Sequence, residues 1–156
     1  MRADLDVIEA SLRRSNDDLI ADHRLADIQA ATDVFGFHLY SLDLRQNSES
    51  HEDILTELFR LAGVAEDYRS LPERRRVEIL TTELASARPL VPRGVTLSEA
   101  TERELGIMRA AADAVAAYGP EVVPQCIISM CASVSDLLEP MILLKEVGLI
   151  SVDDGV

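Results

Sequence analysis

The chain has few aromatic residues and few positive charges. It contains no Trp, aromatics make up 4% of its 156 residues, and its formal net charge is −13. Packing must therefore come mainly from Leu, Ile, Val and Ala. The acidic excess argues against nonspecific binding to nucleic acid or anionic membranes, because both favour clustered positive charge. It does not exclude an anionic small ligand, because one local arginine can outweigh a distant acidic surface.

Long apolar runs and cysteines are also scarce. No stretch approaches 18 uncharged apolar residues and no apolar run follows Met1, so we expect neither a membrane span nor a signal peptide. Four residues separate Cys126 from Cys131, whereas redox and zinc pairs are usually separated by two. We therefore expect two buried thiols, a reducing compartment and a cytoplasmic location.

Helical spacing of apolar residues covers most of the chain. The predicted helices span residues 3–20, 22–35, 52–62, 70–85, 98–117 and 134–148. The expected N-caps are Asp22, Ser50 and Ser70. Pro140 either kinks the last helix or lies near its true first turn. Residues 87–95, with two prolines and a glycine, predict a loop.

Two segments predict strands, at residues 37–44 and 125–130. Two strands do not make an independently stable sheet, and the second segment is apolar enough to be buried on both faces. We therefore predict a helix-dominated α/β fold, a slice of a (β/α)-barrel with about two parallel strands and five to six helices. Residues 1–156 would form a single segment of a larger barrel domain, with an N-terminal helix (1–18) and a loose tail (149–156).

Two charged residues, Asp43 and Arg45, lie at the end of the first predicted strand. Phe37, Leu39, Ser41, Asp43 and Arg45 share one face, which is apolar at its start and charged at its end. The inward face of a barrel strand that opens on a catalytic mouth has this pattern. The guanidinium of Arg45 can match two phosphate or carboxylate oxygens at once, and Asp43 could hold it in place. The alternative is that the two residues form only a salt bridge at a strand end.

Other candidate residues favour structural roles. His23, His38 and His51 are scattered over different predicted elements and have no convergent carboxylates, so we predict no metal site. Ser48 shows no His/Asp partner for nucleophilic catalysis, and helix capping suits it better. Arg88, in the loop, is expected to make structural contacts.

Three segments resemble the phosphoenolpyruvate carboxylase family. "LDLRQNSESH" at 42–51 is similar to the family's "DIRQES…H" segment, and "RPL" at 88–90 to its "KRPL". "ISMCASVSDLLEPMILLKEVG" at 128–148 is similar to its "ISMA…PSDVL…LLLKEAG". Each match is short, but together they occur in the family's order with similar gaps. The resemblance covers roughly residues 19–148.

The resemblance implies an activity that composition does not. Family members form oxaloacetate and phosphate from phosphoenolpyruvate and bicarbonate with Mg²⁺, usually as homotetramers built on a (β/α)-barrel. This reaction fixes carbon and feeds the tricarboxylic acid cycle. The arginine of the matched segment contacts the substrate phosphate, which implies that role for Arg45, with Asp43 and Gln46 as possible supports.

The chain departs from the family pattern at two positions. Asn47 stands where the family often has Glu, and Val134 where it often has Pro. The family's catalytic histidine lies upstream of the matched segment, and its acidic metal ligands and "GRGG" loop lie downstream. We find no equivalents here, so the resemblance implies an internal segment that is inactive alone and binds no Mg²⁺ itself.

The alternative is a non-catalytic, α-rich interaction module. A barrel slice exposes strand edges and apolar surface, and should aggregate or bind hydrophobic dye. An independent module should instead be a monomer with a cooperative thermal transition.

Overall fold

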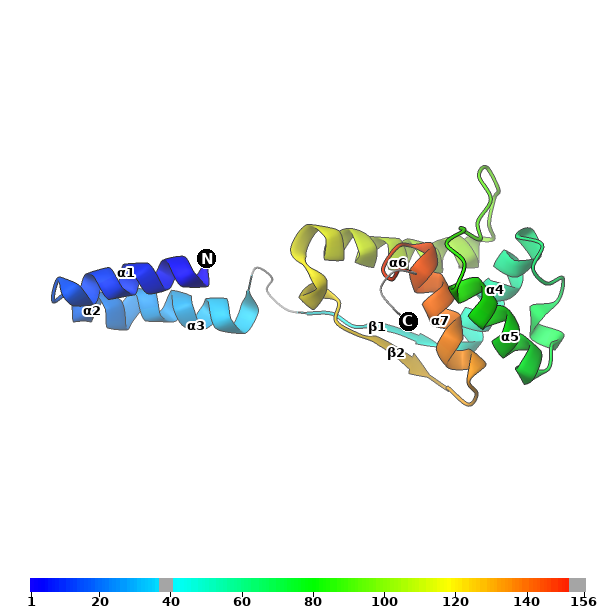
Figure 1. The fold of residues 1–156 in the computed structure, drawn as a ribbon, viewed down its shortest axis with the longest axis horizontal. Coiled ribbons are helices and arrows are strands. Elements are labelled where there is room, and N and C mark those ends of the chain that lie inside the picture. The colour runs from blue at the N-terminus through cyan, green and yellow to red at the C-terminus, as the bar shows by residue number, and fades with distance from the viewer. Residues whose placement is uncertain (37–40, 152–156) are drawn as a thin grey trace. The chain divides into compact units, whose positions relative to one another are not determined.

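The computed structural model describes residues 1–36 and 41–151, and the chain divides into two compact units, Met1–Ser41 and Leu42–Val156 (Figure 1). The first half of the first predicted strand, at residues 37–40, lies outside the described residues, as does most of the tail. That residues 1–156 belong to one larger barrel domain stays a prediction.

The first unit consists of helices. Its elements are α1 (Arg2–Arg14), α2 (Asp18–Ile20), the π-helical η1 (Ala21–Leu25) and α3 (Ala26–Phe35). The predicted helix over 3–20 is wrong at its end, because Asn16 has a left-handed φ of 61° that a right-handed helix does not continue through. Asp22 is not a cap but lies inside η1, where its carboxylate pairs with Arg13 at 2.7 Å. The α3 helix ends at Phe35, where the predicted helix over 22–35 also ends, and Gly36 follows it.

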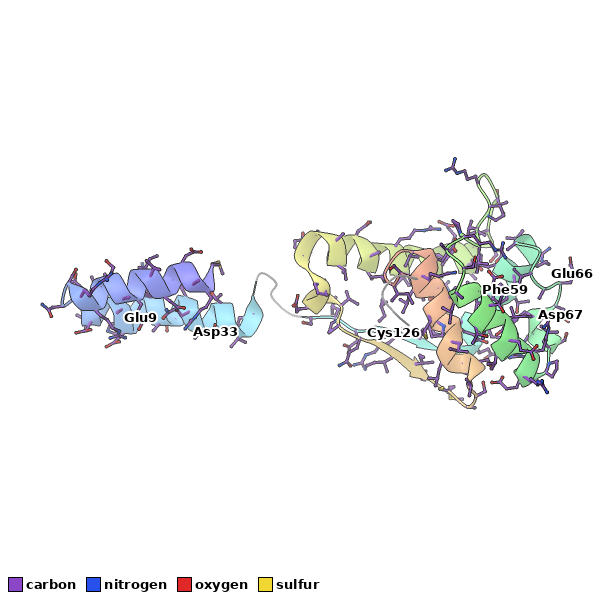
Figure 2. The ribbon with its side chains drawn as sticks, in the orientation of Figure 1. Glu9, Asp33, Phe59, Glu66, Asp67 and Cys126 are labelled. Atoms are coloured by element: carbon purple, nitrogen blue, oxygen red, sulfur yellow. The ribbon has the colours of Figure 1, made fainter. Side chains whose placement is uncertain are left out.

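Polar contacts join the helices of this unit. Gln29 is buried, and its amide donates hydrogen bonds to the carboxylates of Asp6 at 3.2 Å and Glu9 at 3.0 Å (Glu9 is labelled in Figure 2). Ala21 and Leu25 are the apolar residues buried here among those described. Apolar burial within this unit is therefore small.

The second unit contains a parallel strand pair and the larger helices. Its elements are β1 (Leu44–Asn47), α4 (Ser48–Leu61), η2 (Tyr68–Ser70), α5 (Glu73–Leu84), α6 (Glu99–Tyr118), η3 (Pro120–Val122), β2 (Cys126–Ser129) and α7 (Ser135–Glu146). Each strand is followed by a helix. The predicted helix-dominated α/β class with two parallel strands is confirmed.

The first strand lies later in the chain than the sequence predicts. β1 begins at Leu44, which pairs with Cys126, and ends at Asn47, which pairs with Ser129. Alternating apolar residues indicate extended backbone, but a strand also needs a partner. Just before Leu44, the amide of Leu42 instead donates to the carbonyl of Val122, the last residue of η3, at 2.9 Å.

Only one face of the sheet is covered within the described chain. Leu44, Gln46, Cys126 and Ile128 are half-buried, and they alternate with residues of the other face, where Ile127 is 37% exposed. In Figure 1 α6 lies above the two strands. Within the described residues the second face of β2 stays exposed. Burial of this strand on both faces would need neighbours that the described chain does not supply, and it stays a prediction.

Two more of the predicted N-caps are wrong. Asn47 caps α4, its Oδ1 accepting a hydrogen bond from Ser50 N at 2.8 Å, so Ser50 is not the cap. Ser70 lies in η2 and its hydroxyl donates to the Asp67 carbonyl, so it does not cap α5 either. Ser98 caps α6 through Thr101 N.

The core lies among α4, α5, α6 and α7. Phe59 and Tyr68 are fully buried and pack edge to face, with ring centroids 5.0 Å apart (Phe59 is labelled in Figure 2). Leucines fill most of the remaining core, as the composition predicts. The buried Pro140 lies inside α7, which begins at Ser135 and continues past it.

Two carboxylates hold the predicted loop over 87–95. Glu146, at the end of α7, accepts hydrogen bonds from the amides of Leu90 at 2.7 Å and Val91 at 3.0 Å. Glu57 of α4 accepts from the amide and hydroxyl of Ser98, at 2.8 and 2.6 Å. The loop is therefore fixed at both ends. Among the described helices, none is long and apolar enough to cross a membrane.

Candidate functional site

Arg45 lies on the uncovered face of the sheet. Its side chain is 71% exposed, and its Nη2 donates to Asp43 Oδ2 at 2.8 Å. It belongs to β1 itself rather than following the strand, because β1 runs from Leu44 to Asn47. Both interpretations of the sequence expected this ion pair, so its presence does not choose between them.

A cavity of about 340 Å³ opens beside Arg45. Arg45, Asn47, Ile127 and Ser129 line it, together with part of Gln46. Arg45 pairs with Ile127 and Asn47 with Ser129, so the lining comes from adjacent positions near the carboxyl ends of both strands. The guanidinium therefore stands at the edge of a solvent-exposed hollow that an anion can reach.

Gln46 makes its contacts on the other side of the sheet. Its Nε2 donates to Glu104 Oε2 of α6 at 2.8 Å, and its Oε1 accepts from the amide of Asn47 at 2.9 Å. Gln46 therefore ties β1 to α6 and to the start of α4. The structure does not bring its side-chain amide to the same hollow as the Arg45 guanidinium.

Ser48 and Asp136 stabilise the carboxyl ends of the strands, a role that the sequence predicted for neither residue. Ser48 donates to the carbonyl of Met130 at 3.0 Å, and Met130 has a left-handed φ of 60°. Asp136 accepts from the amides of Ala132 at 2.7 Å and Ser133 at 2.9 Å. The signal for Asp136 was its place three residues after a serine at a helix start.

Electrostatics agree with that role for Asp136. Its partial burial alone would raise its pKa, but the hydrogen bonds from Ala132 and Ser133 outweigh burial and leave the pKa below its usual value. The carboxylate is therefore ionised at neutral pH, and the hydrogen bonds it accepts stabilise the loop after β2.

The candidate metal and thiol residues do not converge. No group of three or more His, Cys, Asp or Glu side chains within the described ranges could hold a metal ion. His38 lies outside those ranges. His51 is fully buried in α4 rather than serving as a cap. Cys126 is half-buried and Cys131 is exposed, so the prediction of two buried thiols is wrong for Cys131, which follows the end of β2.

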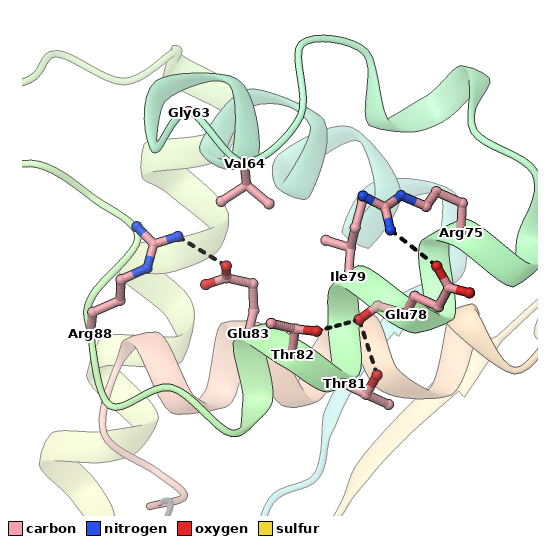
Figure 3. A pocket seen from close by; sticks show the side chains of 9 residues that line it. All are labelled: Gly63, Val64, Arg75, Glu78, Ile79, Thr81, Thr82, Glu83 and Arg88. Atoms are coloured by element: carbon pink, nitrogen blue, oxygen red, sulfur yellow. Dashed lines mark hydrogen bonds and ion pairs between the residues drawn. The ribbon is translucent and has the colours of Figure 1, made fainter.

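A larger cavity, of about 610 Å³, lies elsewhere, beside α5 (Figure 3). Its two arginines already have acidic partners: Arg88 pairs with Glu83 at 2.9 Å and Arg75 with Glu78 at 3.0 Å. The predicted structural contact of Arg88 is thus present. Arg45 is paired in the same way with Asp43, so the ion pairs do not rank the two cavities. What separates the hollow beside Arg45 is its place near the carboxyl ends of the two parallel strands.

Comparisons with known proteins agree with the three sequence segments. A family model described as phosphoenolpyruvate carboxylase matches residues 1–155. The chain is 57% identical over 150 residues to the phosphoenolpyruvate carboxylase of Corynebacterium efficiens, which is 96% of this chain and 16% of that protein. Identity is 60% over 145 residues with the Corynebacterium glutamicum enzyme, covering 92% and 16%.

A third relative, the phosphoenolpyruvate carboxylase of Mycolicibacterium paratuberculosis, is 57% identical over 150 residues, again 96% of this chain and 16% of that protein. The chain therefore spans about 16% of the length of the curated relatives that it matches. The match runs through both units and includes the strand that carries Arg45, its ion-pair partner Asp43 and the fastened end of β2. This chain belongs to the phosphoenolpyruvate carboxylase family.

Proposed function

We propose that this chain is the part of a phosphoenolpyruvate carboxylase that contributes Arg45 as a contact to the substrate phosphate. One observation carries the proposal: the guanidinium is 71% exposed beside an open cavity near the carboxyl ends of two parallel strands. Parallel α/β folds place their ligands at that end of the sheet.

The chemistry of the family gives Arg45 a defined task. When bicarbonate attacks phosphoenolpyruvate, the phosphoryl oxygens carry negative charge that fixed positive groups must stabilise. A guanidinium has five N–H donors, so the ion pair at Nη2 leaves donors for phosphoryl oxygens. Asp43 orients the guanidinium, and Gln46 fixes the strand that carries it by bonding to Glu104.

The rest of the reaction belongs to the larger polypeptide. We propose that the whole protein makes oxaloacetate with Mg²⁺, works as a homotetramer in the cytoplasm and supplies the tricarboxylic acid cycle. The described residues hold no group of three or more metal-binding side chains. Other parts of the polypeptide would supply the Mg²⁺ ligands, and this chain alone would be inactive.

The test uses a full-length chimera. The Corynebacterium glutamicum enzyme, 60% identical over this segment, receives these residues in place of its own. Arg45→Gln is expected to lower kcat/KM for phosphoenolpyruvate by roughly 10²–10³-fold, since a fixed group that stabilises transition-state charge is lost. Arg45→Lys keeps the charge but loses the planar fork, so its kcat/KM should lie between those of the parent and of Arg45→Gln.

Arg93→Gln is the matched control, since Arg93 is an exposed arginine of the 87–95 loop. It should leave kcat/KM unchanged. If Arg45→Gln also leaves kcat/KM unchanged in a chimera that is active, then the ion pair with Asp43 is only structural and the proposed contact is wrong.

A further inference from the structure

His51 is a buried polar residue without a protein partner. Its side chain is 0% exposed in the first turns of α4, and neither ring nitrogen has a hydrogen bond to any described residue. Buried polar atoms in folded proteins are nearly always hydrogen-bonded, to protein or to ordered water. The ring nitrogens of His51 therefore need a hydrogen-bond partner that the described residues do not provide.

A small cavity lies beside this ring. Its volume is about 60 Å³, and its lining includes His51, Gln46, Glu104 and Cys126, with apolar residues of β1 and α6. A water molecule needs roughly 10–15 Å³ of such space and two to four polar partners, and the cavity offers both. Organic ligands usually occupy several hundred Å³, so the cavity is too small for them.

The protonation of His51 suits a water partner. Burial lowers the pKa of His51, and the negative charges of Glu104 and Asp136 oppose this only partly. The ring is therefore neutral at pH 7. A neutral imidazole has one N–H donor and one acceptor nitrogen, and water can satisfy either.

The other polar groups of the cavity bond to β1, the strand that carries Arg45. Gln46, the neighbour of Arg45 in β1, bonds through one amide N–H to Glu104 at 2.8 Å. Its carbonyl oxygen accepts from the amide of Asn47. The second amide N–H of Gln46 and the remaining lone pairs of Glu104 are available to water.

We propose that this cavity is a buried hydration site, in which water joins His51 to Gln46 and Glu104, and that His51 is thereby a positioning residue for Arg45. His51 acts through water on Gln46, whose side chain bonds to the backbone amide of Asn47 and to Glu104 of α6 and so fixes β1. The last step, from Gln46 to substrate binding, rests on the proposed function of Arg45. The hydration site itself does not.

The first experiment tests the site in the 156-residue chain by NMR, with histidine labelled in its ring nitrogens. At pH 7 we expect His51 to be a single neutral tautomer, with a ring N–H protected from exchange and showing cross-relaxation with a long-lived water. His51→Phe should abolish both signals. A charged ring, or a protected ring N–H without cross-relaxation to water, would overturn the hydration site.

The second experiment tests the positioning role in the full-length chimera. His51→Phe should raise KM for phosphoenolpyruvate roughly tenfold while changing kcat less, as loss of an outer-shell partner does. His51→Gln, which keeps a polar atom for the water, should restore KM to within about threefold. This conservative variant and the unaltered chain keep the proposal testable even if the Phe variant does not fold.

Tyr68→Phe is the matched control. It removes another fully buried polar group from the same unit, one that does not line this cavity. An equal rise in KM for Tyr68→Phe and His51→Phe would mean a general loss of stability and would overturn the positioning role. If Arg45→Gln has no effect on kcat/KM, the proposed function fails, while the NMR result still decides the hydration site.

Discussion

Glu139 is a buried acid in the middle of α7. It is 0% exposed, its Oε1 accepts a hydrogen bond from the Tyr68 hydroxyl at 3.0 Å, and its Oε2 has no partner among the described residues. Burial raises the pKa of Glu139 to about 7, although the Tyr68 hydrogen bond opposes the shift. The folded chain therefore favours the protonated acid.

The raised pKa predicts a pH-dependent stability. Because the folded state binds this proton more tightly than the unfolded state, whose pKa lies near 4.5, the contribution is present below about pH 4.5 and is lost as pH rises through about 7. Glu139→Gln mimics the protonated form. We expect its free energy of unfolding to fall less between pH 5 and pH 8 than that of the parent, by roughly 1–3 kcal/mol.

Urea unfolding at several pH values checks this, with Glu66→Gln as the control because Glu66 is exposed. Equal pH dependence in the parent and Glu139→Gln would mean that the acid is ionised in the fold.

Single residues were predictable where their role depends on near neighbours in the sequence. The spacing of Asp43 and Arg45 predicted an ion pair, and it is present. The burial of His51 was not predictable, because the cavity beside it is lined by Glu104 and Met108 of α6, more than 50 residues later in the chain. The exposure of Cys131 likewise depends on where β2 ends.

At the scale of elements, the turn from β1 into α4 depends on Asn47. This residue ends β1, pairs with Ser129 and caps α4. Its short side chain places Oδ1 within 2.8 Å of Ser50 N, and Asn is among the preferred N-caps. The departure from the family's Glu at this position therefore has a structural role here.

Replacing this cap should weaken the second unit. Asn47→Ala is expected to lower the free energy of unfolding by about 1 kcal/mol, whereas Asn47→Asp keeps an acceptor and should lower it by less. Ser50→Ala is the control, because Ser50 donates its amide to the cap and its side chain is not the cap. Urea denaturation measures all three. A Ser50→Ala loss as large as that of Asn47→Ala would contradict the assignment.

Helices were easier to predict from the sequence than strands. The α6 helix and the 87–95 loop agree with prediction because periodicity, a serine cap and prolines are local signals. The predicted strand over 37–44 shares only Leu44 with β1, because pairing depends on β2, about 80 residues away. The end of α1 was missed because nothing in the local pattern required the left-handed Asn16.

At the scale of the whole molecule, the second unit has an incomplete sheet. The two described strands pair only with each other, and one face carries the exposed side chains of Arg45, Ile127 and Ser129. The relatives are about six times as long as this chain. A sheet of two strands does not usually stand alone, which supports the proposal that further strands belong to it.

We therefore expect the purified 156-residue chain to form no oxaloacetate from phosphoenolpyruvate, bicarbonate and Mg²⁺ above a heat-treated sample. The physical reason is that one phosphate contact does not assemble the charge needed for the reaction. A coupled malate dehydrogenase assay measures this, and the full-length chimera is the positive control. Measurable turnover by the chain alone would contradict the expectation.

The hydrogen bonds that Glu146 and Glu57 accept around the 87–95 loop have a practical consequence. Glu146 anchors the chain at Leu90 and Val91, and Glu57 anchors it again at Ser98. The arch between these anchors contains no helix or strand (Figure 1), and lengthening a loop costs little entropy. Its tip, around Arg93 and Gly94, is thus a natural insertion point for an epitope or a fluorophore, whose attachment would leave α5 and α6 in register.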